Sequence, residues 1–287
     1  MVDTKTVGII SKPRVAQAAG IVPELIAWLE GRGIEVRLDE VTAEYAGREG
    51  GLPREQVPEG CQLLVVLGGD GTLLAAARAL RGREVPLFAV NLGGLGFLTA
   101  ITTDEIYPEL ERAFRGEHRI GRRRMLHCEL ARGGETLATY EALNDVVLTK
   151  ASLARMIDLD AYVDEQLVCA YKADGLIIST PTGSTAYSLS AGGPIIFPRV
   201  GALCLTPISP HMLTNRPVIV PDASVIKIVN HAADGESYLT IDGQTGEPLK
   251  RGDHVMCRRS SHVLQLIRPP RSMFFDVLRQ KLKWGER

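Results

Sequence analysis

The hydrophobic pattern of this chain changes once, near residue 122, and that change limits the possible folds more than any other feature. Before it, short apolar runs such as residues 63–67 alternate with stretches such as residues 73–80, which carry apolar residues at helical spacing. Strands that alternate with helices indicate a parallel, doubly wound sheet. After it, apolar and polar residues alternate with period two between turn residues, as in residues 157–163. This second pattern predicts an antiparallel β-sandwich domain.

These patterns predict an α/β plus all-β protein in three segments. Residues 1–121 form a Rossmann-like α/β domain, residues 122–268 form the β-sandwich, and residues 269–287 return to the first domain. A chain of 287 residues is long enough for two domains. Within the first domain we expect a helix over residues 15–29, a loop or lid over residues 44–60, and a helix to about residue 114 behind a capping box at Thr102 and Glu105. Residues 273–284 have apolar residues at helical spacing.

Composition excludes several classes of protein. The 33 basic and 34 acidic residues give a formal net charge of −1, without the basic surplus typical of nucleic-acid binders. No run approaches the roughly 20 apolar residues that span a bilayer, and no secretory signal is recognisable, so we expect no membrane partner and a cytoplasmic location. The five cysteines are far apart and form no C-x-x-C pair, which predicts free thiols rather than disulfides or a zinc site.

The strongest local motif is a glycine turn after the buried strand predicted at residues 63–67. The turn consists of Gly68, Gly69, Asp70, Gly71 and Thr72. Open parallel sheets bind ligands at the carboxyl ends of their strands, and backbone amides in a glycine turn before a helix suit a phosphate group. The turn is not a Walker A loop, and Leu74 stands where a dinucleotide fingerprint needs glycine or alanine.

Asp70 is the informative residue of this turn. A carboxylate among phosphates is repulsive unless it accepts a proton from an attacking hydroxyl or holds Mg²⁺. The alternative is that Asp70 only caps the following helix, since aspartate is a favoured capping residue. The buried strand before it and the second glycine turn at Gly93 and Gly94 favour the catalytic interpretation.

Three further segments carry candidate binding residues. Residues 174–188 lead from an apolar strand into a dense set of hydroxyls, glycines and Tyr187, whose ring can stack on a base; the alternative is a Ser/Thr-rich surface loop. Asn144 and Asp145 precede an apolar run at residues 146–148. Asp242, Gly243 and Gln244 follow a predicted strand. Each of the last two segments, taken alone, is typical of a turn.

Together and in this order, these motifs resemble the NAD kinase family over nearly the whole chain. The glycine turn is shared with diacylglycerol, sphingosine and phosphofructokinase-type kinases, whereas residues 174–190 are much more specific. The resemblance implies ATP-dependent phosphorylation of the 2′-hydroxyl of the NAD adenosine ribose, giving NADP and ADP, in a cleft between the two domains. It also implies a divalent cation, for which we expect Mg²⁺, and a homo-oligomer of two or four chains.

The resemblance also implies roles for individual residues. Asp70 is the expected proton acceptor, and Asp70 with Gly71 contacts the dinucleotide. The other expected NAD-binding positions are Asn144, Asp145, Arg155, Lys172, Asp174, Thr185, Ala186, Tyr187, Ser188, Leu189, Ser190 and Gln244. This sequence has Asp145 where many relatives have glutamate. The motifs identify no metal ligands.

Two rival functions stay open at this stage. A lipid or sphingoid-base kinase would share the fold and the glycine turn but would need an apolar acceptor site, which the polar residues 174–190 argue against. A non-catalytic NAD(P) sensor would keep those residues but has no need of Asp70. The sequence leaves open whether polyphosphate replaces ATP and whether NADH is accepted.

Overall fold

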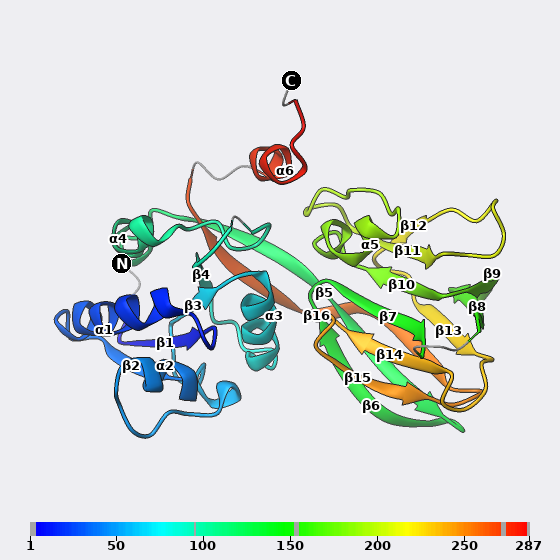
Figure 1. Ribbon diagram of the computed structural model, residues 1–287, viewed down its shortest axis with the longest axis horizontal. Coiled ribbons are helices and arrows are strands. Elements are labelled where there is room, and N and C mark those ends of the chain that lie inside the picture. The colour runs from blue at the N-terminus through cyan, green and yellow to red at the C-terminus, as the bar shows by residue number, and fades with distance from the viewer. Residues whose placement is uncertain (1–3, 95, 152–154, 271–273, 286–287) are drawn as a thin grey trace. The chain divides into compact units, whose positions relative to one another are not determined.

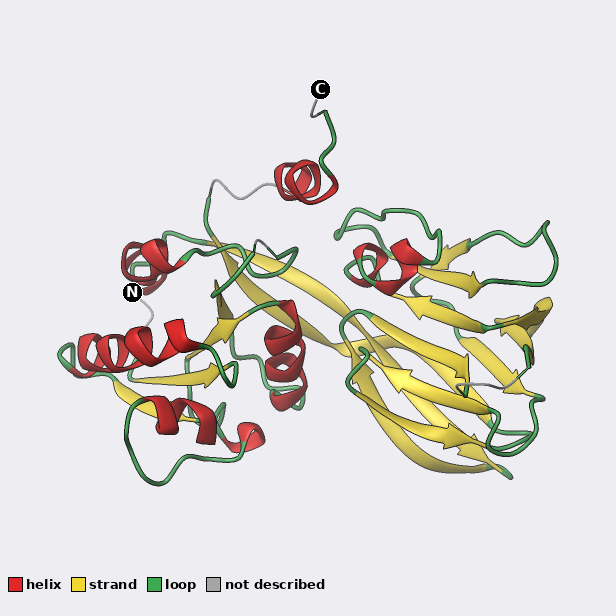
Figure 2. Ribbon diagram, viewed as in Figure 1, coloured by secondary structure: helices red, strands yellow, loops and turns green. Residues whose placement is uncertain are grey.

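The structure is a computed structural model that describes residues 4–94, 96–151, 155–270 and 274–285. The chain divides into two compact units (Figure 1): unit 1 is Met1–Arg122 with Leu264–Arg287, and unit 2 is Arg123–Val263. Sequence analysis placed these divisions after residues 121 and 268. Figure 2 shows helices gathered in unit 1 and strands dominating unit 2, so the predicted α/β and all-β classes are confirmed.

Unit 1 is built on a parallel sheet. Its strands lie in the order β2, β1, β3, β4 and the end of β16, and every neighbouring pair is parallel. The bounds are β1 Thr6–Ser11, β2 Glu35–Leu38, β3 Leu63–Gly68, β4 Leu87–Asn91 and β16 His254–Arg268. All six residues of β3 are buried, as expected for a central parallel strand with both faces covered.

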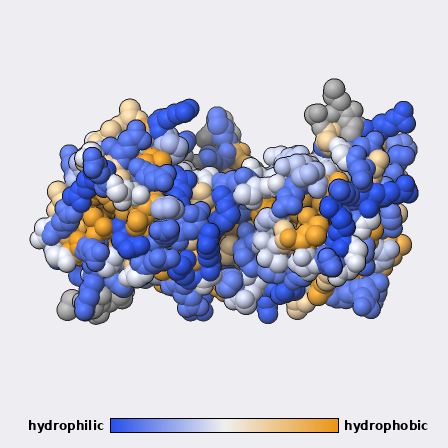
Figure 3. Space-filling model, turned by 90° about the horizontal axis from the view of Figure 1, so that it is seen from below, coloured by the Kyte–Doolittle hydropathy of each residue, from blue (hydrophilic) through white to orange (hydrophobic). Residues whose placement is uncertain are grey.

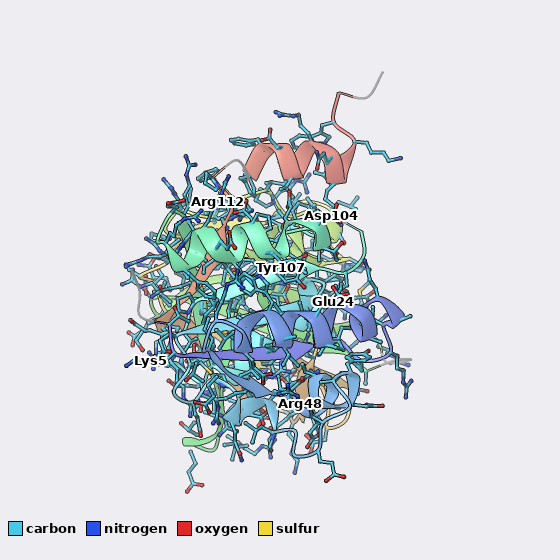
Figure 4. The ribbon with its side chains drawn as sticks, turned by 90° about the vertical axis from the view of Figure 1, so that its left-hand side faces the viewer. Lys5, Glu24, Arg48, Asp104, Tyr107 and Arg112 are labelled. Atoms are coloured by element: carbon cyan, nitrogen blue, oxygen red, sulfur yellow. The ribbon has the colours of Figure 1, made fainter. Side chains whose placement is uncertain are left out.

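Unit 1 also contains α-helices and short 3-10 helices. Their bounds are α1 Ala16–Glu30, α2 Glu40–Tyr45, η1 Arg54–Gln56, α3 Asp70–Ala79, η2 Thr103–Glu105, α4 Ile106–Phe114 and α6 Phe274–Leu282. α1 and α4 share one apolar core with the sheet, while α3 packs against β3. Trp28 of α1 joins the two helices, with ring centroids 5.4 Å from Tyr107 and 6.1 Å from Phe114. Figure 4 shows Tyr107 between α4 and α1.

Most predicted helices of unit 1 are confirmed, and the difference lies in one segment that was predicted as a loop. The residue 44–60 segment, predicted as a loop, begins inside α2 and contains η1. α2 forms because the Asp39 carboxylate accepts a hydrogen bond from the Thr42 amide at 2.9 Å, an N-cap that sequence analysis missed. The predicted capping box of Thr102 and Glu105 is confirmed and includes a 3.1 Å bond from the Thr102 amide to the Glu105 carboxylate. Met273, the predicted start of the last helix, lies outside the described residues.

Unit 2 consists of two packed sheets. One has the order β12, β11, β10, β7, β14, β15, and the other joins β16, β13, β8 and β9, with β5 paired to β16 and β6. The bounds are β5 Arg119–Arg132, β6 Glu135–Ala142, β7 Asp145–Lys150, β8 Ile157–Val163, β9 Gln166–Ala173, β10 Gly175–Ser179, β11 Ala202–Ile208, β12 Val218–Pro221, β13 Ile226–Asn230, β14 Ser237–Ile241 and β15 Thr245–Leu249. Buried residues from both sheets form one apolar core.

The turns of unit 2 follow their residue types. Asp164 and Glu165, predicted as the turn after residue 163, link β8 to β9 with φ angles of 48° and 66°. Two successive positive φ angles are the signature of a tight hairpin whose twist matches the strands. The predicted hairpin is therefore confirmed.

One face of the molecule is largely polar. On the face seen in Figure 3, hydrophilic residues surround small apolar patches. Of the helices in the described residues, none has both the length and the apolar character needed to cross a membrane.

Candidate active site

The glycine turn is partly a turn and partly the start of a helix. β3 ends at Gly68, Gly69 is the N-cap of α3, and α3 begins at Asp70, three residues before the predicted start at Leu73. The Gly69 carbonyl accepts hydrogen bonds from the amides of Thr72 and Leu73 at 3.0 and 3.1 Å. Asp70 is therefore not the N-cap of α3, and the alternative that it caps this helix is wrong.

The Asp70 carboxylate is held by a segment that follows β4. Its Oδ2 accepts a hydrogen bond from the Phe97 amide at 2.9 Å. Its Oδ1 accepts from the amides of Leu98 and Thr99 at 3.1 and 3.2 Å, and from the Thr99 hydroxyl at 3.1 Å. The side chain is half-buried. This carboxylate at the carboxyl end of a central parallel strand thus has a fixed orientation.

A cation lies near this carboxylate. The guanidinium of Arg268, at the end of β16, loses hydration on burial, which lowers its pKa, while the charge of Asp70 acts in the opposite direction. The Arg268 guanidinium and the Asp70 carboxylate therefore attract each other.

In unit 2, a cavity of about 370 Å³ brings together several predicted binding residues. It is lined by Asn144, Asp145, Val147, Thr149, Ala186, Tyr187, Thr240, Asp242 and Gly243. The Tyr187 side chain is 44% exposed, which leaves its ring available for stacking on a ligand. An apolar wall with a few convergent polar groups is the usual composition of a small-molecule site.

Asp242 organises one side of this cavity. Its Oδ1 accepts hydrogen bonds from the amides of Asn144 and Asp145 at 2.7 and 3.0 Å, and its Oδ2 accepts from the Leu143 amide at 2.9 Å. One carboxylate thereby fixes the turn into β7 that carries both Asn144 and Asp145.

Asp145 is a strongly perturbed acid of the cavity. It is only 4% exposed. Burial, first, and the like charge of Asp242, second, raise the pKa of Asp145 from 3.8 to about 7. This group therefore changes its charge near neutral pH, where a ligand hydroxyl or amide would meet either a donor or an acceptor.

Residues 180–190 are more structured than the predicted loop. They contain η3 Gly183–Thr185 and α5 Tyr187–Ser190. Their packing is close, because a Cβ atom at Gly183 would lie 2.0 Å from the carbonyl oxygen of Asn144. Glycine alone permits this approach.

Several hydroxyls of this segment bond within the protein. The Thr180 hydroxyl donates to the Leu143 carbonyl at 2.6 Å, and Ser184 donates to the Pro181 carbonyl at 2.7 Å. Ser188, a predicted binding residue, is fully buried, and its hydroxyl lies 2.9 Å from that of Thr206. These contacts hold the segment that presents Ala186 and Tyr187 to the cavity.

The other predicted binding residues do not line this cavity. Lys172, Arg155 and Gln244 are exposed, and Asp174 forms a 2.8 Å ion pair with Lys150. Thr185 donates to the Thr182 carbonyl at 3.2 Å. Leu189 is half-buried and Ser190 is exposed.

Sequence analysis missed some of the cavity's lining. Val147 and Thr149 lie two and four residues after Asp145 on β7, so period two places all three on one face. Thr240 lies on β14 and pairs with Val147 on the neighbouring strand β7. The alternation along residues 145–149 was a signal for the first two, whereas Asp242 was recognised only as a turn residue.

Comparison with known proteins identifies the family. Residues 7–118 match the model of the ATP-NAD kinase N-terminal domain, and residues 143–269 match that of the ATP-NAD kinase C-terminal domain. An NAD kinase of Solibacter usitatus is 68% identical over 283 residues, covering 99% of both chains. The chain belongs to the NAD kinase family. An NAD kinase of Koribacter versatilis is 47% identical over 287 residues and again covers 99% of both chains.

Solved NAD kinase structures share the fold. Yeast NADH kinase complexed with NADH has a TM-score of 0.92 at 25% identity, covering 100% of this chain and 89% of that one. An NAD kinase from Archaeoglobus fulgidus in complex with ATP has a TM-score of 0.78 at 26% identity, covering 97% and 98%. Membership of the NAD kinase family decides against the lipid or sphingoid-base kinase considered from the sequence.

Proposed function

We propose that this protein transfers the γ-phosphoryl group of ATP to the 2′-hydroxyl of the adenosine ribose of NAD, giving NADP and ADP, with Asp70 as the proton acceptor. Family membership supports the reaction. The observation that carries the role of Asp70 is its carboxylate, fixed by four hydrogen bonds at the carboxyl end of β3.

The geometry of Asp70 suits a general base in phosphoryl transfer. Such reactions need little covalent chemistry from the protein, so positioning and electrostatics supply most of the rate. As the 2′-oxygen attacks the γ-phosphorus, the Asp70 carboxylate takes the hydroxyl proton and the bond from phosphorus to the ADP oxygen breaks. The amino end of α3, which begins at Asp70, offers backbone N–H groups and positive potential to phosphate oxygens.

The cavity of unit 2 is the proposed NAD-binding surface. Asn144 and Asp145 provide amide and carboxyl groups for hydroxyls of the dinucleotide, and the exposed ring of Tyr187 stacks against one of its rings. The buried Ser188 supports this surface through Thr206. Arg155, Lys172, Asp174, Thr185, Leu189, Ser190 and Gln244 stay predicted contacts.

We propose that the divalent cation enters as the MgATP complex. Among the described residues, no group of three or more His, Cys, Asp or Glu side chains is placed to hold a metal ion. Mg²⁺ on nucleotides commonly uses phosphate oxygens and water with few protein ligands. We therefore expect ATP phosphate oxygens and water to supply most of the Mg²⁺ ligands. No step above depends on a metal ion held by the protein.

Location and assembly belong to the same proposal. The cysteines, all five unpaired in the structure, fit a reducing compartment such as the cytoplasm. The homo-oligomer of two or four chains stays a prediction that light scattering on the purified protein can check.

A coupled assay tests the proposed reaction. The protein is incubated with NAD, Mg²⁺ and either ATP or polyphosphate, and NADP is detected with an NADP-specific dehydrogenase. NADP formed with ATP supports the proposal. NADP formed only with polyphosphate would show that polyphosphate, not ATP, is the phosphoryl donor. No NADP from either donor, combined with measurable NAD binding, would favour a non-catalytic NAD(P) sensor instead.

A further inference from the structure

The two oxygens of the Asp70 carboxylate are not equivalent. Oδ1 accepts three hydrogen bonds, from the amides of Leu98 and Thr99 and from the Thr99 hydroxyl, whereas Oδ2 accepts one, from the Phe97 amide. A carboxylate offers about two acceptor sites on each oxygen. Counting the described residues, Oδ1 is therefore fully used, and Oδ2 has one acceptor site left for the proton of a substrate hydroxyl.

We propose that Thr99 is a positioning residue for phosphoryl transfer, whose hydroxyl locks Oδ1 so that Oδ2 of Asp70 receives the proton. This inference rests on the proposed function, in which Asp70 is the proton acceptor. Thr99 touches neither substrate nor phosphate in this scheme and acts only through Asp70.

The packing around Thr99 supports this role. Thr99 is fully buried, so bulk water does not compete for its hydroxyl. A Cβ atom added at Gly96 would lie 2.2 Å from Oδ1 of Asp70 and 2.2 Å from the Thr99 hydroxyl oxygen. The backbone at Gly96 thus lies so close to the hydrogen bond between Thr99 and Asp70 that no side chain fits at position 96. Rotation of the carboxylate would break contacts to Leu98 and Thr99 together.

A change at Thr99 isolates geometry from charge. The nearby cation is Arg268, and it is unaltered when threonine is replaced by a neutral residue. Thr99→Val keeps the shape and removes the hydroxyl, and Thr99→Ser keeps the hydroxyl and removes the methyl group. Loss of activity in the first variant and its retention in the second therefore report on the hydrogen bond to Oδ1.

The chain supplies a matched control. In the same unit, the Thr42 hydroxyl donates to Oδ1 of Asp39, and Thr42 is also fully buried. Asp39 likewise accepts from the Thr42 amide. Thr42→Val therefore removes the same kind of buried hydroxyl–carboxylate bond at a different carboxylate, that of Asp39.

The experiment measures kcat, the KM for NAD and thermal stability in the full-length protein. We expect Thr99→Val to lower kcat about 10- to 100-fold, the size of effect that a small misplacement of a reacting group can cause, with the KM for NAD near that of wild type. Thr99→Ser should keep most of kcat. Thr42→Val should lose stability but keep kcat. If Thr99→Val does not fold, Thr99→Ala removes the hydroxyl without new bulk and carries the same prediction.

A double variant separates this inference from the proposed function. Because Thr99 acts through Asp70, adding Thr99→Val to Asp70→Asn should lower kcat no further. A folded Thr99→Val protein with wild-type kcat would overturn the positioning role alone, provided that Asp70→Asn is inactive. Equal losses in Thr99→Val and Thr99→Ser would also overturn it. An active Asp70→Asn protein would instead overturn the proton-acceptor role.

Discussion

Asp70 in unit 1 and Asp242 in unit 2 make the same kind of contact with the backbone, but a different partner of that contact faces the proposed ligand in each unit. Each carboxylate accepts hydrogen bonds from three successive backbone amides, those of residues 97–99 and those of residues 143–145. In unit 1 the segment fixes the carboxylate that we propose to react. In unit 2 the carboxylate fixes the segment that we propose to bind NAD. One kind of contact can therefore support catalysis or binding, depending on which partner faces the ligand.

The largest expected effect comes from Asp70→Asn. An amide cannot accept the proton, so kcat should fall roughly 10²–10⁴-fold, the usual contribution of a general base. The KM for NAD should stay near that of wild type because the cavity of unit 2 is unchanged. Steady-state kinetics at saturating MgATP check this. Wild-type turnover in the folded variant would remove Asp70 from the proposed mechanism.

Asp242→Asn makes the same substitution in the matching contact, and its effect should fall on binding. Asparagine has one acceptor oxygen, so it cannot satisfy both the Leu143 amide and the amides of Asn144 and Asp145. An unsatisfied buried donor costs about 1–3 kcal/mol, which corresponds to a roughly 5- to 150-fold higher KM for NAD if the loss appears in binding. Kinetics should show kcat close to wild type. A fall in kcat with unchanged KM would erase the contrast between the two aspartates.

The third prediction concerns the pH dependence of stability through Asp145. Its pKa is about 7 in the folded protein and 3.8 as the ordinary value, so between these pH values the folded state binds the proton and the unfolded state does not. Stability from this group is therefore lost as pH rises from about 4 to 7 and is constant above that. Relative to Asp145→Asn, the wild type should lose about 2 kcal/mol between pH 5 and pH 7.

Denaturant unfolding of both proteins at several pH values measures this loss. When Asp242 is replaced by asparagine, the protein with Asp145 should lose less stability between pH 5 and pH 7. The reason is that the like charge that helps raise the pKa of Asp145 is gone. Parallel stability curves for wild type and Asp145→Asn would show that Asp145 does not titrate in this range.

Local patterns predicted the architecture because they record burial on each face of an element. Alternation over residues 157–163 predicted β8 and its hairpin correctly, and the apolar run at residues 63–67 predicted β3. The start of α3 was placed too late because Gly69 and Gly71 have low helix propensity. Packing against β3 and the anchoring of Asp70 overcome that propensity at the first turn.

Non-local contacts account for what the sequence did not predict. The partners of Asp70 lie 27 to 29 residues along the chain, and those of Asp242 lie 97 to 99 residues away. No periodicity records a hydrogen bond at such a separation. The same holds for the bond between the Ser188 and Thr206 hydroxyls, since a buried hydroxyl must find a partner within the fold; the predicted NAD contact of Ser188 stays a prediction.

The close approach at Gly96 has an evolutionary consequence. The three atoms nearest to a Cβ at that position belong to Asp70 and Thr99, so the ban on side chains there originates in the carboxylate and the hydroxyl. A side chain at position 96 therefore becomes possible only after Asp70 and Thr99 have been replaced. In a descendant that no longer used the Asp70 carboxylate, we expect residues 70, 96 and 99 all to be substituted. A chain with a replaced residue 70 that still has glycine at position 96 would have lost the carboxylate recently.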